Sequence, residues 1–157
     1  MRLYLVQHGD AVPAEEDPER PLTERGRKDI ARLGKHVLRT HPDVYRIEHS
    51  GRARAEQTAQ ILALAAKPTD GIHALDSIGP RGDVVALAER VNGYTGDRVI
   101  VSHQPLLSQL VDRLLMGKER AEPLVRFVPG TLVILDRDTG GTWSLVAVVP
   151  PALTTRA

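Results

Sequence analysis

Residues 1–13 read MRLYLVQHGDAVP, and this stretch decides the fold expected for the rest of the chain. Residues 3–6 form a short apolar run that is typical of a buried strand. The run leads directly into Gln7, His8 and Gly9. Ligands of open α/β sheets collect beyond the carboxyl ends of the strands, so a histidine at this position indicates chemistry.

Downstream of this stretch, short apolar runs rich in β-branched residues alternate with segments of helical periodicity. Thr23 is the expected N-cap of the first helix. The pattern predicts an α/β fold with three α/β/α layers: a mostly parallel central sheet with helices on both faces, and an antiparallel hairpin at the end. The further strands are expected at 98–102, 131–135 and 143–149, and the helices at 24–40, 53–66, 84–91 and 105–116.

The composition fits a single domain over residues 1–149, followed by a loose tail over 150–157, because 157 residues with 41% hydrophobic content provide one core. A formal charge of +1 argues against a nucleic-acid or membrane partner. Cysteine is absent, which excludes disulfides and thiolate catalysis. The first apolar run is too short for a signal peptide, and no stretch reaches transmembrane length, so a cytoplasmic protein is expected.

A second histidine stands at a strand exit, because the strand expected at 98–102 runs into His103. If the two strands are neighbours, His8 and His103 face each other over one edge of the sheet. Arg52 and Arg54 lie at the start of the helix expected from residue 53, where backbone N–H groups favour an anion. Two imidazoles and a guanidinium make a pocket for phosphate, and a neutral histidine is also a nucleophile.

Five pieces of the chain carry a family resemblance in their order. These are LVQHGDA (5–11), RPLTERG (20–26), SGRARAEQTA (50–59), GPRGDV (79–84) and VSHQPLL (101–107). Together they resemble the histidine phosphatase superfamily (phosphoglycerate mutase-like), whose signature is Arg-His-Gly after the first strand, and within it the SixA-type phosphohistidine phosphatases.

The resemblance implies a cofactor-independent phosphatase. His8 would accept the phosphoryl group, Arg54 would clamp the phosphate, and His103 would bind it and stabilise the transferring group. The implied partner is a phosphorylated protein, such as a histidine phosphotransfer domain, or a small phosphate ester. Phosphoryl transfer depends mainly on positioning and charge stabilisation, which agrees with these roles.

Position 7 departs from the signature, because Gln7 stands where the family has arginine. Gln7 keeps hydrogen-bond donors and belongs with the phosphate-binding residues, but it lacks the positive charge and the bidentate fork. Arg52 or Arg81 are candidates to replace that charge. The alternative is a catalytically weakened phosphate-binding module.

A general acid for ester cleavage is not evident in the sequence. Asp76 and Asp83 lie in the region where the family places one, near Ser77, but Asp83 is favoured as the cap of the helix expected from residue 84. An alkoxide leaves poorly without a proton, whereas imidazole leaves almost unaided. The sequence therefore favours phosphohistidine substrates, with a small-molecule phosphomonoesterase as the alternative.

The other polar candidates are assigned to structural positions. Asp10 is expected to cap its turn, the acidic run at 15–19 to be a solvated loop, and Trp143 to pack in the core or at an edge. The remaining histidines lack the spacing of metal ligands, so no metal site is expected, and they are placed at the surface or an edge. They are His36, His41, His49 and His73.

Overall fold

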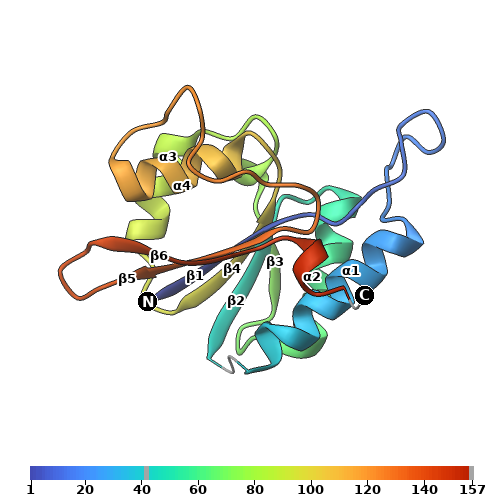
Figure 1. Ribbon diagram of the computed structural model, residues 1–157, viewed down its shortest axis with the longest axis horizontal. Helices are drawn as coiled ribbons and strands as arrows, with labels where there is room; N and C mark the ends of the chain where they lie inside the picture. The colour runs from blue at the N-terminus through green and yellow to red at the C-terminus, as the bar shows by residue number, and fades with distance from the viewer. Residues whose placement is uncertain (41–42, 156–157) are drawn as a thin grey trace.

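The computed structural model describes residues 1–40 and 43–155 and has a sheet at its centre (Figure 1). Within these residues the sheet has six strands in the order β3-β2-β4-β1-β5-β6. β1 pairs in parallel with β4, β4 with β2, and β2 with β3, whereas β5 and β6 are antiparallel to their neighbours. The strands are β1 (Arg2–Gln7), β2 (Val44–His49), β3 (Ile72–Ala74), β4 (Asp97–Ser102), β5 (Leu132–Arg137) and β6 (Trp143–Val149).

The helices cover both faces of this sheet. α1 (Glu24–His36) and α2 (Ala53–Ala66) pack together on one face, and α3 (Val84–Asn92) and α4 (Leu106–Met116) pack together on the other (Figure 1). This arrangement confirms the predicted three-layer α/β fold with a mostly parallel sheet and a C-terminal hairpin. Three short 3-10 helices complete the described elements: η1 (Leu38–Thr40), η2 (Asp76–Ile78) and η3 (Pro151–Leu153).

Side-chain caps fix where two of the helices begin. The hydroxyl of Thr23 accepts a hydrogen bond from the amide of Gly26 at 3.0 Å, which confirms it as the N-cap of α1. The carboxylate of Asp83 accepts from the amides of Val85 and Ala86, so Asp83 is the N-cap of α3. Such caps satisfy amides that have no partner within the helix.

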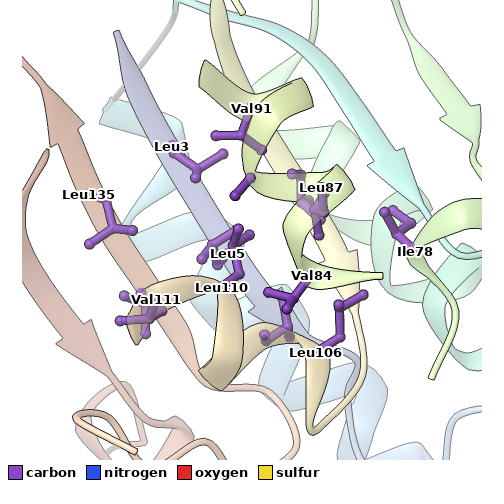
Figure 2. Packing of buried hydrophobic residues seen from close by; sticks show 14 of the residues in the cluster. Leu3, Leu5, Ile78, Val84, Leu87, Val91, Leu106, Leu110, Val111 and Leu135 are labelled. Carbon is purple, nitrogen blue, oxygen red and sulfur yellow. The ribbon is translucent and has the colours of Figure 1, made fainter. Parts of the chain in front are cut away.

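Each face of the sheet has its own apolar core. Figure 2 shows the core on the side of α3 and α4, where Leu3 and Leu5 of β1 contact the inward faces of both helices. The opposite core is formed by β1, β2 and β4 against α1 and α2, and it includes Tyr4, Ile47 and Leu62. Alternate residues of β1 therefore serve opposite cores, as expected for a central strand buried on both faces.

The structure adds two strands that the sequence analysis did not predict. β2 carries charged side chains, and Glu48 within it is fully buried. Its carboxylate lies 3.4 Å from Arg98 and 3.3 Å from Arg90, which compensates the buried charge. β3 has only three residues at the edge of the sheet, too few to give a periodic signal.

Two boundaries also differ from the sequence analysis. The first helix was expected to reach residue 40, but α1 ends at His36 and the chain tightens into η1. The tail from residue 150 was expected to be loose, and the structure places η3 there, against α1 and Gly130.

Candidate active site

The two histidines at the strand exits lie side by side. β1 and β4 pair in parallel with Gln7 opposite Ser102, so the next residues are His8 and His103. The amide of His8 donates to the carbonyl of Ser102 at 3.2 Å, and the imidazole ring centroids are 5.0 Å apart. The predicted juxtaposition of the two histidines at one edge of the sheet is confirmed.

The tautomer of His8 follows from its main-chain contact. Nδ1 lies 2.8 Å from the carbonyl oxygen of Gly9, which accepts only, so Nδ1 carries the proton and donates it. Nε2 therefore holds the lone pair. The side chain is 8% exposed, and burial lowers the pKa of His8 to about 4, with further lowering by Arg54 and Arg20. His8 is thus a neutral imidazole near pH 7, with a nucleophilic Nε2.

A short hydrogen-bonded chain joins the loop of His8 to the first turns of α2. The amide of Gly9 donates to the hydroxyl of Thr58 at 3.0 Å, and that hydroxyl donates to the carbonyl of Arg54 at 2.7 Å. A Cβ atom on Gly9 would lie 2.9 Å from a side-chain carbon of Ile30, so the close packing of Gly9 against α1 requires glycine. The positions of His8 and Arg54 are therefore coupled through the fold.

His103 is even more buried than His8, with 3% of its surface exposed. Its Nε2 lies 2.5 Å from the hydroxyl oxygen of Ser50, and its Nδ1 is buried without a hydrogen-bond partner among the residues that the structure describes. Burial lowers the pKa of His103 to about 3, and His8, Arg54, Arg52 and Arg20 lower it further. His103 is therefore also neutral near pH 7.

Three arginines supply the positive charge around the histidines. Arg54 is the second residue of α2, and its Nε is buried with no partner in the described part of the chain. Burial, followed by the charges of Arg20 and Arg52, lowers the pKa of Arg54. Arg52 is the exposed N-cap residue of α2. An anion is favoured here by these cations and by the N-terminus of α2.

Arg20 was missed as a site residue in the sequence analysis. It stands in the piece RPLTERG, which supported the family resemblance, but its distance from His8 along the chain gave no signal of proximity. Its Nε donates to the carbonyl of Val12 at 3.2 Å, and its charge acts on His8, His103 and Arg54. Arg20 is thus a further source of positive charge at this site, together with Arg52, whereas Arg81 is exposed in the turn before α3.

Gln7 is held tightly by its backbone. Its amide donates to the carbonyl of Thr131 at 3.1 Å, and its carbonyl accepts from Gly130 at 3.0 Å. The side chain is 9% exposed, and Oε1 is buried without a partner among the described residues. The side chain next to His8 is therefore a neutral amide, and the nearby positive charge comes from arginines on other elements.

The two carboxylates considered as general acids, Asp76 and Asp83, lie in a 3-10 helix and at a helix cap. Asp83 caps α3, which confirms the favoured interpretation, and Asp76 is exposed in the first position of η2, next to exposed Ser77. Asp10 is the carboxylate whose charge acts on His8, and it accepts a hydrogen bond from the Thr23 hydroxyl at 2.8 Å. That contact ties the turn of Asp10 to the N-terminus of α1.

The remaining polar candidates divide as follows. His49 is 5% exposed at the end of β2, so its assignment to the surface or an edge was wrong, and its position at the end of an unpredicted strand explains the error. His36 is exposed, His73 lies on edge strand β3, and His41 lies outside the described residues. Trp143 packs in the core and donates to the Asn92 side chain at 2.8 Å.

The fold and the site define an α/β protein with two neutral histidines and several arginines at the carboxyl edge of its parallel strands. Residues 3–77 match the family described as the histidine phosphatase superfamily (branch 1), and the chain belongs to this superfamily. An uncharacterized protein of Picosynechococcus sp. is 30% identical over 125 residues, which cover 75% of each chain.

Solved structures agree with this assignment at the level of the fold. The protein histidine phosphatase SixA in complex with tungstate has a TM-score of 0.83 at 24% identity, over 97% of this chain and 98% of that one. The alpha-ribazole phosphatase from Shigella flexneri has a TM-score of 0.70 at 19% identity over 100% of both chains. Within residues 1–40 and 43–155, no helix has the length and apolar character needed to cross a membrane.

Proposed function

We propose that the protein is a phosphohistidine phosphatase, which removes the phosphoryl group from a histidine of another protein through a covalent intermediate on His8. The observation that carries the proposal is the contact between His8 Nδ1 and the Gly9 carbonyl, because it leaves Nε2 as a fixed, unprotonated nucleophile. The low pKa of His8 supports the same role.

In the first step, the lone pair of His8 Nε2 attacks phosphorus. Solvent protonates the other nitrogen of the substrate ring, a P–N bond to His8 forms, and the P–N bond of the substrate breaks, so that the substrate histidine leaves as a neutral imidazole. Arg54, Arg20 and Arg52 offset the charge of the phosphoryl oxygens, and His103 donates to one of them. Transfer of this kind depends on positioning and on such charge stabilisation.

In the second step, water attacks phosphorus and the bond to His8 breaks, giving inorganic phosphate. The ring keeps its Nδ1 proton throughout, because the Gly9 carbonyl accepts it. The phosphorylated ring is therefore cationic, and it leaves phosphorus as a neutral imidazole. A neutral leaving group explains why hydrolysis of this intermediate needs no separate acid.

The same reasoning supports phosphohistidine over an alcohol ester as the substrate. Ester cleavage requires an acid for the leaving alkoxide, whereas Asp83 is engaged as a helix cap and Asp76 is exposed. An imidazole leaving group has a conjugate-acid pKa of about 6.5 and needs little help. The likeness to a protein named as a histidine phosphatase also supports this choice, while the likeness to an alpha-ribazole phosphatase keeps the ester alternative.

The test is phosphate release from a protein that carries phosphohistidine. His8→Ala is expected to abolish release, whereas His36→Ala, which changes an exposed histidine on α1, leaves it unchanged. Brief incubation with a radiolabelled substrate should leave label on wild-type protein and none on His8→Ala. Full activity of His8→Ala would overturn the proposal.

The second candidate is a phosphate-binding module with little or no turnover, which the amide of Gln7 favours because it stands in place of a charged clamp. Binding of inorganic phosphate by wild type, without release from phosphohistidine, would identify this function. A small-molecule phosphomonoesterase would instead hydrolyse an aryl or alkyl phosphate and lose that activity in Asp76→Asn or Asp83→Asn.

A further inference from the structure

The hydroxyl of Ser50 lies against His103. The distance from Ser50 Oγ to His103 Nε2 is 2.5 Å, and the two residues are 8% and 3% exposed. Ser50 directly follows β2 and His103 directly follows β4, and these strands pair in parallel with His49 opposite Val101. The contact is therefore set by two neighbouring strand exits rather than by a mobile surface side chain.

A second contact of the hydroxyl favours one direction for this hydrogen bond. The amide of Arg52 donates to Ser50 Oγ at 3.5 Å, so the oxygen already accepts one hydrogen bond. A hydroxyl has one proton and two lone pairs, so Ser50 can donate this proton to Nε2 of His103, which is within reach. A neutral imidazole has one N–H and one lone pair, and if Nε2 accepts from Ser50 the ring proton is on Nδ1.

Nδ1 of His103 is the remaining polar atom of the ring. It is buried and has no hydrogen-bond partner among the described residues. A buried donor is stabilised by an acceptor, and phosphoryl oxygens accept only. His103 and His8 are neighbours, so an oxyanion on His8 would lie beside the ring of His103.

We infer that Ser50 is a positioning residue. Its hydroxyl donates to Nε2 of His103 and thereby keeps the ring proton on Nδ1, where it is available to a phosphoryl oxygen. The role toward the phosphoryl group rests on the proposed function, whereas the tautomer of His103 does not. A hydrogen bond to one nitrogen of a histidine fixes the form in which the other nitrogen acts, and losing such a partner costs about 10- to 100-fold at metal sites.

The tautomer is measured by two-bond nitrogen–proton NMR on protein labelled with 15N-histidine, with His103→Gln to assign the signals. In wild type, His103 is expected as the Nδ1–H form. Ser50→Ala should give a mixture or the Nε2–H form, and Ser50→Thr, which keeps the hydroxyl, should retain Nδ1–H. A wild-type proton on Nε2, or an unchanged tautomer in Ser50→Ala, would overturn the inference whether or not the protein is a phosphatase.

The second readout is the affinity for inorganic phosphate, titrated by the same NMR signals. Ser50→Ala should raise Kd about tenfold, Ser50→Thr should recover the wild-type value, and Ser108→Ala should leave it unchanged. Ser108 is a matched control, because it is also buried but donates to the Pro105 carbonyl. Unchanged affinity in Ser50→Ala would overturn the role toward the oxyanion. Phosphate binding with this dependence, but no release from phosphohistidine, would overturn the proposed function and leave the role of Ser50 standing.

Discussion

Gln7 places an amide next to His8, where the resemblance to the superfamily gives arginine. An amide donates hydrogen bonds but has no net charge, so it stabilises a transferring phosphoryl group less than a guanidinium does. We therefore expect Gln7→Arg to raise kcat/KM for phosphohistidine by about 100-fold, the scale of one well-placed donor in a transition state. Steady-state phosphate release measures this.

The control for Gln7→Arg is Gln60→Arg, which adds the same charge to an exposed position of α2. Its kcat/KM should equal that of wild type. If Gln7→Arg gives no gain, then the arginines on other elements already supply the charge that position 7 lacks.

Arg20 is expected to supply much of the positive charge that position 7 lacks. Its charge acts on both histidines and on Arg54, although it lies on the loop before α1. Arg20→Gln should lower kcat/KM at least about tenfold and weaken phosphate binding. Arg27→Gln, at an exposed position of α1, should change neither quantity. Equal activity of Arg20→Gln and wild type would exclude a role for Arg20.

At the scale of elements, variants of Asp83 distinguish its role as the N-cap of α3 from a role as a general acid. Asp83→Ala removes the N-cap and should lower the free energy of unfolding by about 1 kcal/mol, measured by urea denaturation. Asp83→Asn keeps an acceptor for the cap but cannot donate a proton as an acid. Phosphohistidine hydrolysis should persist in both variants. Loss of hydrolysis in Asp83→Asn with unchanged stability would assign Asp83 to the chemistry instead.

β2 depends on a buried ion pair. Glu48→Ala leaves Arg98, whose side chain is 10% exposed, without its partner, and should lower the free energy of unfolding by about 3 kcal/mol. Glu89→Ala, at an exposed position of α3, should change it by less than about 0.5 kcal/mol. Equal midpoints for the two variants in urea denaturation would contradict this assignment.

β2 also shows why part of the fold could not be predicted from the sequence. β1, β4, β5 and β6 are apolar runs, and their burial is visible in the residue types themselves. β2 reads VYRIEH, and the burial of Glu48 within it becomes favourable through Arg98 and Arg90, which come from distant segments. The periodicity of apolar residues along the chain does not indicate ion pairs between residues that are distant in sequence.

The site divides in the same way. His8, His103 and Arg54 follow strand ends or begin a helix, so their proximity follows from the rule that parallel strands end at one edge. Arg20 reaches the site from an irregular loop, and Ser50 follows the unpredicted strand β2. Their positions depend on tertiary contacts that no local periodicity encodes.

At the scale of the whole molecule, the stability of the fold depends on the two buried histidines of the site, His8 and His103. In the unfolded chain an imidazole has a pKa of about 6.5, whereas the pKa of His8 is lowered to about 4 and that of His103 to about 3 in the folded protein. Between these values the unfolded state binds protons that the folded state does not. The contribution of these two histidines to the free energy of unfolding is therefore fully present above pH 6.5 and is lost as the pH falls through 6 and 5.

The size of this loss makes it measurable. Each such histidine contributes up to about 1.4 kcal/mol per pH unit, so the free energy of unfolding should fall by roughly 2 kcal/mol or more from pH 7 to pH 5. Asp70 and Asp136 have lowered pKa values and act only below their usual range, so this interval reports on histidines. Burial also lowers the pKa of His49, which adds to the slope in the same interval. Urea denaturation across the interval, in buffers without phosphate, gives the slope. His103→Gln should reduce this slope, and His36→Gln should not. A flat or inverted profile in wild type would mean that the folded protein accepts protons on these rings at least as readily as the unfolded chain does.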